Sequence, residues 1–412
     1  MEKFSKENLG ELMKWLNLVF LFLFSVHLFG FPDKYIILWC VFAIAVFWFQ
    51  NKRLCLDKMF WILALAIILN GLGTYHYLRE SLSYTWKDIF KMVIPTILVY
   101  PFMKQAAFGK KDADIEKILM AIVFGTFVYS MLNFYMFWRD GYMIIEGAEG
   151  GRNWSDFWTH YGWRATHYSY WGCFMAGFSG YALYLLLEKK WIPGIFYTVL
   201  IVVENAVQIA VDNRMVLCIT AVSLGISLIM FCYFNLKDKT KIRKALFVAL
   251  GAVAAVALIL ALDLFGIRSS GYFYRFLTRS GGILRNERFQ IMFEAIKMLP
   301  SHWMGGGDMW AAGYQHVHNY WLQVANVSGI VPFILWMIVN ISVICDMLRL
   351  LRSPEISMGL KYRFLLLMIA IICYFMLEPG GTESNWFIIF YVLLIALLKQ
   401  TVHQPNRKKA EK

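Results

Sequence analysis

The sequence is poor in charged residues, which make up 16% of its 412 residues, against about 25% in soluble domains. Hydrophobic residues account for 59% of the chain and its mean hydropathy is +0.54. This composition excludes a water-soluble globular domain. Most of the chain must therefore lie in an apolar environment, such as a lipid bilayer.

Cysteine is absent from the long loops that we expect outside the membrane, and all seven cysteines fall in expected spans or on the cytoplasmic side. This excludes a disulfide framework and a CxxC metal site. The segment Met1–Lys14 mixes lysine with glutamate and lacks a small-residue cleavage site, so we expect no cleavable signal peptide.

Hydrophobic runs recur along most of the chain, at about the 17–25 residues that a helix needs to cross a bilayer. We therefore predict an all-α, polytopic membrane protein, with residues 1–412 in a single integral membrane domain. The expected spans are 13–31, 35–50, 59–77, 88–108, 116–138, 168–188, 192–211, 215–234, 245–266, 325–348, 362–377 and 384–399.

The distribution of basic residues predicts the topology through the positive-inside rule. With the N-terminus inside, cytoplasmic segments hold 26 of the 40 Lys and Arg and 12 of the 27 acids, whereas outer segments hold 14 of each. Both termini are then cytoplasmic. The net charge of +13 reflects this topology and does not indicate nucleic-acid binding.

The two sides also differ in the kind of base. The inner segments carry 20 Lys and 6 Arg, and the outer segments carry 4 Lys and 10 Arg. Arginine binds phosphate oxygens in a bidentate fork. An arginine-rich outer face therefore favours recognition of a phosphorylated ligand there, although a solvated basic surface is the alternative.

Two outer segments are long, 139–167 and 267–324, and long loops in compact proteins are usually functional. The first is dense in Trp and Tyr and includes Arg164, which we take as a candidate substrate-binding residue. Its aromatic rings suit an interfacial belt; stacking on sugar rings is the other reading.

The second loop, 267–324, contains apolar residues at helical spacing between Asn286 and Leu299, followed by Pro300. This predicts an amphipathic helix on the outer membrane surface. Arg285 and Arg288 stand three residues apart at its start, where a helix N-terminus favours anions. Snorkelling to lipid headgroups is the alternative role for these arginines.

The helix is followed by MGGGDMW, residues 304–310. Glycines let the backbone approach a ligand closely, and consecutive amides can form an anion-binding nest. Gly305 and Gly307 are therefore candidate substrate-binding residues.

The seventh expected span ends in VENAVQIAVDNR. Glu204, Gln208 and Asp212 recur every four residues and form a polar stripe that leads to Arg214 at the outer boundary. Ionisable residues inside a membrane are costly and are functional candidates by default. A structural salt bridge is the alternative for Glu204.

Two histidines stand two residues apart in QHVHNYWLQ, residues 315–323. Residues at this spacing do not share a helix face, and no third ligand accompanies them, so a metal site is disfavoured. His318 is a candidate for acid–base work, which suits imidazole near neutral pH. We expect His316 to be a supporting residue.

The order of these features resembles the O-antigen ligase and polymerase superfamily of bacterial membrane glycosyltransferases. The chain has Arg214 after a polar membrane helix, an arginine-bearing amphipathic helix ending at Pro300, and a Gly-x-Gly turn. It then has His318-Asn319 followed after nine residues by Gly329. The resemblance covers about 200–332.

The resemblance implies a GT-C-like membrane fold in the bacterial cytoplasmic (inner) membrane, with its active site on the outer, periplasmic face. The reaction moves a glycan from undecaprenyl pyrophosphate to a saccharide or glycolipid acceptor, without a metal or cofactor. Arg214 and Arg288 match the family's essential arginines and would stabilise the pyrophosphate leaving group. His318 would act as general base, and Asn319 would orient its ring.

Two questions stay open at this point. A polymerase extends one lipid-linked chain with another, whereas a ligase uses a separate acceptor. From a different class, a transporter or flippase of lipid-linked glycans would carry polar helix breaks at mid-membrane in several spans, and only the seventh expected span is notably polar.

Overall fold

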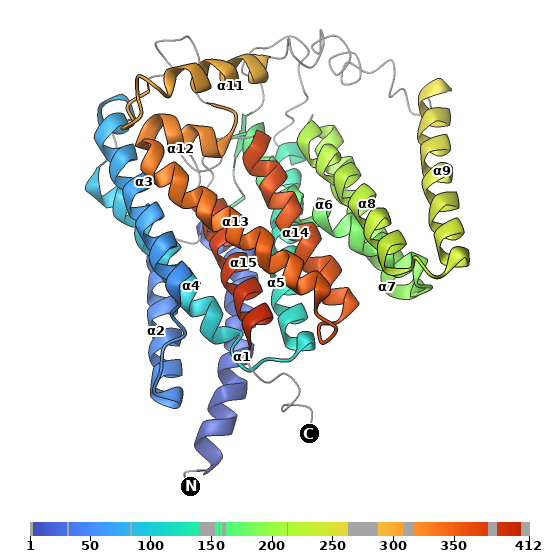
Figure 1. Cartoon of the computed structure of the whole chain (residues 1–412), viewed down its shortest axis with the longest axis horizontal. Helices are drawn as coiled ribbons and strands as arrows, with labels where there is room; N and C mark the ends of the chain where they lie inside the picture. The colour runs from blue at the N-terminus through green and yellow to red at the C-terminus, as the bar shows by residue number, and fades with distance from the viewer. Residues whose placement is uncertain are drawn as a thin grey trace. The chain divides into compact units, whose positions relative to one another are not determined.

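The structure, a computed structural model, is helical with one small sheet (Figure 1). It describes residues 3–30, 33–82, 85–139, 153–155, 157–158, 162–211, 213–262, 287–307, 317–377 and 385–404.

The chain divides into two compact units, Met1–Tyr129 with Ile291–Lys412, and Ser130–Gln290. Helices α5 (Asp112–Arg139) and α11 (Glu287–Met298) contribute residues to both units. The first unit also holds α1 (Lys3–Ser25), η1 (Leu28–Gly30), α2 (Asp33–Asn51), α3 (Lys58–Leu82), α4 (Trp86–Ala106), α12 (Tyr320–Ser328), α13 (Ile330–Arg352), α14 (Met358–Leu377) and α15 (Asn385–His403). The second unit holds β1 (Asn153–Ser155), β2 (Gly162–Arg164), α6 (Ala165–Leu187), α7 (Trp191–Ala210), α8 (Arg214–Phe234) and α9 (Lys239–Ala261).

The helical, membrane-spanning class predicted from composition is confirmed. Within the described residues, eight helices are long and apolar enough to cross a bilayer. They are Asp33–Asn51, Lys58–Tyr77, Asp112–Arg139, Trp191–Ala210, Met215–Phe234, Ile330–Arg352, Met358–Leu377 and Trp386–His403. Each of the twelve expected spans overlaps a helix, but the count of twelve crossings stays a prediction.

In the first unit, the start of α1 and the end of α15 lie on the same side of the helices. Phe24, near the end of α1, packs on Trp386 and Phe390 at the start of α15, with ring centroids 4.9 and 4.8 Å apart. The two helices therefore run antiparallel, and the start of α1 lies at the same end of the unit as the end of α15 (Figure 1). Same-side termini agree with the predicted topology.

Helix α12 lies at the opposite end of this unit, next to α3 and α13 (Figure 1). Its aromatic residues anchor it to the core. Tyr320 and Trp321 pack on Phe375 of α14 at 4.8 and 5.2 Å, and Trp321 packs on Trp336 of α13 at 5.7 Å. These three rings, with Tyr320, are almost fully buried. The segment just before α12 is therefore attached to a rigid part of the unit.

The membrane helix starts later than the expected span 325–348, because the helical backbone is interrupted at Gly329, between α12 and α13. Gly329 has φ +95°, a conformation that costs other residues strain. The amide of Ile330 donates to the carbonyl of Trp303 at 2.8 Å instead of continuing the hydrogen bonds of α12. The membrane helix accordingly starts at Ile330.

In the second unit, α6 packs closely on both α7 and α8. Serines of α8 fasten it to the backbone of α6: Ser223 Oγ donates to the carbonyl of Gly177 and Ser227 Oγ to that of Gly180, both at 2.6 Å. Such close contact suits small residues at a helix interface inside a membrane. This packing fixes α7, which carries the polar stripe.

Candidate active site

His318 lies directly before the N-terminus of α12 and is half-buried. Asn319 is the N-cap of this helix, and its Oδ1 accepts a hydrogen bond from the amide of Leu322 at 3.0 Å. The Asn319 Nδ2 donates to the carbonyl of Met376, near the end of α14, at 3.4 Å. Asn319 therefore fixes where the helix begins, and with it the backbone position of His318.

Val317 holds the other side of His318. It is 0% exposed and packs with Ile291 and Ala295 of α11 in one small apolar cluster. Its amide donates to Oε1 of Gln323 at 2.9 Å. The imidazole at position 318 thus extends from a backbone that is held on both sides by hydrogen bonds and packing.

The amphipathic helix predicted for Asn286–Leu299 is confirmed as α11, Glu287–Met298. Ile291 and Ala295 are buried, so this side of the helix packs inward. Phe289, Phe293 and Ile296 are 37%, 52% and 48% exposed. These three residues form an apolar stripe on the outside of the helix, one turn apart. Arg288 lies in the first turn and is half-buried.

The glycine turn has a structural task. The amides of Gly305, Gly306 and Gly307 donate to the carbonyls of His302, Val327 and Asn326 at 2.8, 3.1 and 2.9 Å. They are therefore not available for the anion nest that the sequence suggested. The glycines instead let the turn press against the last turn of α12.

This contact places Gly305 and Gly307 away from His318. They lie against Asn326 and Val327, at the C-terminal end of α12, whereas His318 precedes its N-terminal end. Helix α12 is nine residues long, which amounts to about 13 Å. A substrate-binding role for these two glycines stays a prediction. Their observed contacts are with the C-terminal end of α12.

Replacing Gly305 with alanine is expected to destabilise the protein by about 1–3 kcal/mol. Its φ is +104°, and an added Cβ would lie 2.5 Å from the carbonyl oxygen of Val327. The matched control is Gly225→Ala in α8, where a Cβ meets nothing within 4 Å. Thermal unfolding in detergent should rank Gly305→Ala below wild type and Gly225→Ala at or above it; equal melting temperatures would contradict this role.

The polar stripe of α7 forms a buried network in the second unit. Glu204 is 0% exposed, and its Oε1 accepts from Ser130 Oγ at 2.8 Å and from Gln208 Nε2 at 2.6 Å. No described cation pairs with it, so the salt-bridge alternative is not observed. Gly172 of α6 makes the space: a Cβ there would lie 2.6 Å from Gln208 Nε2.

The network continues to the N-terminus of α8. Gln208 Oε1 accepts from Asn213 Nδ2 at 2.8 Å, and Asn213 Oδ1 caps α8 by accepting from the amide of Met215 at 3.2 Å. Arg214 is the first residue of that helix. The chain of hydrogen bonds from Glu204 therefore ends at the N-cap of α8, next to Arg214 in the sequence.

Glu204→Leu is expected to lose about 1–3 kcal/mol of stability, because the buried Ser130 Oγ and Gln208 Nε2 would each lose the acceptor that Glu204 provides. Glu204→Gln keeps an acceptor at the same place and removes an unpaired buried carboxylate, so it should be no less stable than wild type. Chemical denaturation of both variants measures the difference. Equal losses of stability in the two variants would show that the hydrogen bonds of Glu204 do not account for its contribution to stability.

The remaining candidates are only partly placed. Arg164 lies in β2, opposite Asn153 of β1. Arg285, His316 and Asp212 lie outside the described residues. Arg214 and Arg288 belong to the second unit and His318 to the first, so their convergence on one substrate stays a prediction. Asn319, Gly305 and Gly307 are gathered around α12 in the first unit.

Some supporting residues were not predicted from the sequence. Ser130 and Gln323 carry no motif, because their roles depend on neighbours far along the chain or on a turn. Asn213 carried a usable signal, since an asparagine directly before a helix is a typical N-cap. All seven cysteines are free thiols, and the described residues hold no cluster of three metal-ligating side chains.

Comparison with known proteins leaves the family open. No protein-family model matches the chain, and no curated protein is significantly similar to it. The resemblance to the O-antigen ligase and polymerase superfamily therefore depends on the order and spacing of the motifs alone.

Proposed function

We propose that this protein is a membrane glycosyltransferase that moves a glycan from undecaprenyl pyrophosphate to a saccharide hydroxyl on the outer face of the membrane. One observation carries the proposal. The half-buried His318 directly precedes the capped helix α12 and is held by Val317 and Asn319; in Figure 1, α12 lies at the end of its unit opposite the start of α1.

In the proposed reaction, His318, Arg214 and Arg288 each have a chemical role. The acceptor hydroxyl loses its proton to the imidazole of His318 and its oxygen attacks the anomeric carbon of the donor sugar. The bond from that carbon to the pyrophosphate oxygen breaks, and the leaving group keeps the electron pair. Arg214 and Arg288 are assigned to the charge that develops there, for which fixed guanidinium groups are suited.

The apolar stripe of α11 supports a lipid-linked donor. Phe289, Phe293 and Ile296 stay exposed while the opposite face of the same helix packs inward. A helix with this division can lie in the membrane surface with its apolar side in the lipid. We therefore assign membrane lipid, and the polyprenyl chain of the donor, as the partners of this stripe.

The test uses purified protein reconstituted in lipid, with undecaprenyl pyrophosphate-linked oligosaccharide as donor. A ladder of repeats from donor alone is expected for a polymerase, and a single adduct that needs a separate acceptor is expected for a ligase. Either product supports transfer. Protein-dependent movement of the donor across the bilayer without any new glycosidic bond would contradict the proposal and favour the transporter.

A further inference from the structure

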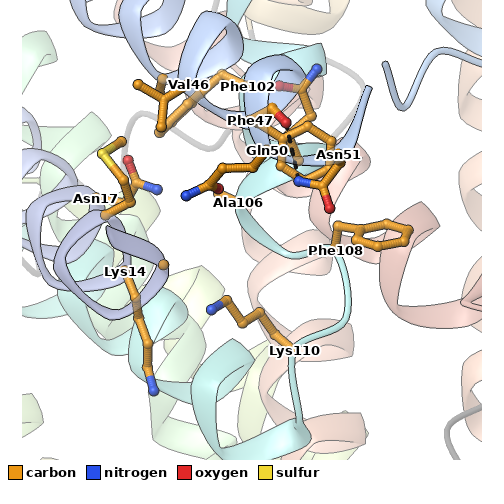
Figure 2. Close-up of a pocket in the computed structure, with 14 residues that line it drawn as sticks. Lys14, Asn17, Val46, Phe47, Gln50, Asn51, Phe102, Ala106, Phe108 and Lys110 are labelled. Carbon is orange, nitrogen blue, oxygen red and sulfur yellow. Dashed lines mark hydrogen bonds between the residues drawn. The ribbon is translucent and has the colours of Figure 1, made fainter. Parts of the chain in front are cut away.

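A second candidate site lies at the other end of the first unit, in a cavity of about 160 Å³ between α1, α2 and the end of α4 (Figure 2). Its lining combines Met13, Lys14 and Asn17 of α1 with Gln50 of α2. This is the end of the unit at which α1 starts and α15 ends. The positive-inside rule predicts that this end is cytoplasmic, so the cavity is separate from the His318 region.

Three carboxamides in this cavity have atoms without a hydrogen-bond partner among the described residues. Gln105 is 4% exposed, and this holds for both its Nε2 and its Oε1; in Gln50 it holds for Nε2 and in Asn17 for Oδ1. A buried polar group without a partner costs about 1–3 kcal/mol. Several such groups around one cavity indicate an occupant that offers both hydrogen-bond donors and acceptors.

The two lysines of the cavity differ in their partners. Lys14 is paired with Asp114 of α5 at 2.8 Å, and in Figure 2 it runs away from the space between the helices. Lys110 is half-buried, forms no ion pair with any described residue, and reaches toward that space. One ammonium group is therefore left for an anion, next to carboxamides that suit hydroxyl groups.

The surroundings of the cavity carry exposed tryptophans. On the same helices, Trp15 and Trp48 are 59% and 44% exposed. The ammonium of Lys52 lies 5.3 Å from the ring of Trp48. Exposed tryptophans with a nearby lysine are typical of the level at which lipid headgroups lie. The occupant is therefore within reach of the membrane surface.

We propose that this cavity binds a phosphoglycerol group, with its hydroxyls on the carboxamides of Gln105, Gln50 and Asn17 and its phosphate on Lys110. The size agrees for the glycerol part: a cavity of about 150 Å³ holds a six-carbon ring, and glycerol also has six non-hydrogen atoms. The phosphate adds four more non-hydrogen atoms, which we place outside this volume, next to Lys110. The group is supplied either by phosphatidylglycerol of the adjacent leaflet or by free glycerol phosphate, which share this chemistry.

The test measures binding to the full-length protein with two variants. Gln105→Leu removes the most buried carboxamide at similar volume, and Lys110→Gln removes the unpaired charge. Lys111→Gln is the matched control, because Lys111 is exposed and does not line the cavity. Native mass spectrometry after incubation with vesicles of phosphatidylglycerol and phosphatidylcholine reports lipid retention, and thermal unfolding reports binding of glycerol 3-phosphate and of inorganic phosphate.

We expect phosphatidylglycerol to bind about tenfold more weakly to each cavity variant, which corresponds to the loss of one or two hydrogen bonds. Its affinity for Lys111→Gln should equal that for wild type. Without lipid, Gln105→Leu should unfold at or above the wild-type temperature, because an unpartnered amide is gone. Stabilisation by glycerol 3-phosphate alone would support the site with the free source. Equal retention by wild type and Gln105→Leu, or equal stabilisation by inorganic phosphate and glycerol 3-phosphate, would overturn the proposal.

Discussion

Replacing His318 with alanine is expected to lower the rate of glycan transfer by roughly 10²–10⁴-fold, the usual contribution of a positioned acid–base group. The loss should fall on kcat rather than KM, because a general base acts on the proton that leaves in the transition state. Initial rates with the undecaprenyl pyrophosphate-linked donor, at several acceptor concentrations, separate the two constants.

The structure supplies the controls for this variant. Val317 and Asn319, which fix the backbone around position 318, are unchanged, so the protein should purify and unfold like wild type. His76→Ala removes an exposed histidine of α3 and should keep wild-type activity. A His318→Ala protein that folds normally and transfers glycan at the wild-type rate would remove His318 from the mechanism.

Replacing Arg288 with alanine is expected to lower kcat by roughly 10²–10³-fold, similar to the loss of one group that stabilises charge in a transition state. Arg288→Lys should recover only a small part, because an ammonium group cannot hold two phosphate oxygens in a planar fork. The measurement compares kcat for the two variants with the same lipid-linked donor.

Lys297→Ala is the matched control for Arg288. It removes a cation from the other end of α11, where Lys297 is 69% exposed and pairs with Glu294 at 2.6 Å. Its activity should stay within about twofold of wild type, since exposed ion pairs contribute little. If Arg288→Lys equalled wild type, the role would be general charge at the membrane surface instead of phosphate recognition.

The class of the protein and several elements could be predicted from sequence because they depend on local patterns. Apolar runs of bilayer length predicted the helices, and the spacing between Asn286 and Leu299 with Pro300 behind it predicted α11. The identity of the inward face of α11 could not be predicted. It depends on Val317, whose burial is a tertiary property.

The interruption at Gly329 shows a second limit. A continuous apolar sequence reads as one helix, and the positive φ of Gly329 becomes visible only with the contact between Ile330 and Trp303. The glycine turn likewise suggested a ligand site by composition, but its amides donate to backbone carbonyls, those of Gly306 and Gly307 to carbonyls of α12. Hydrogen-bond partners, unlike periodicity, cannot be read from residue types alone.

The candidate sites show the same difference between local spacing, which can be predicted from sequence, and tertiary contacts, which cannot. Glu204 and Gln208 stand four apart in the sequence and were predicted as one stripe. Ser130 and Asn213, which complete their network, come from other elements. The cavity around Gln105 carries no motif, because its residues are brought together from three separate helices.

The most direct measurement follows both products of the reconstituted protein in the presence of a chelator. Released undecaprenyl pyrophosphate and new glycosidic bonds are counted in the same sample. Transfer to an acceptor hydroxyl predicts one bond for each pyrophosphate released, with no requirement for added metal. Release without bond formation, or complete dependence on a divalent cation, would contradict a metal-independent glycosyltransferase.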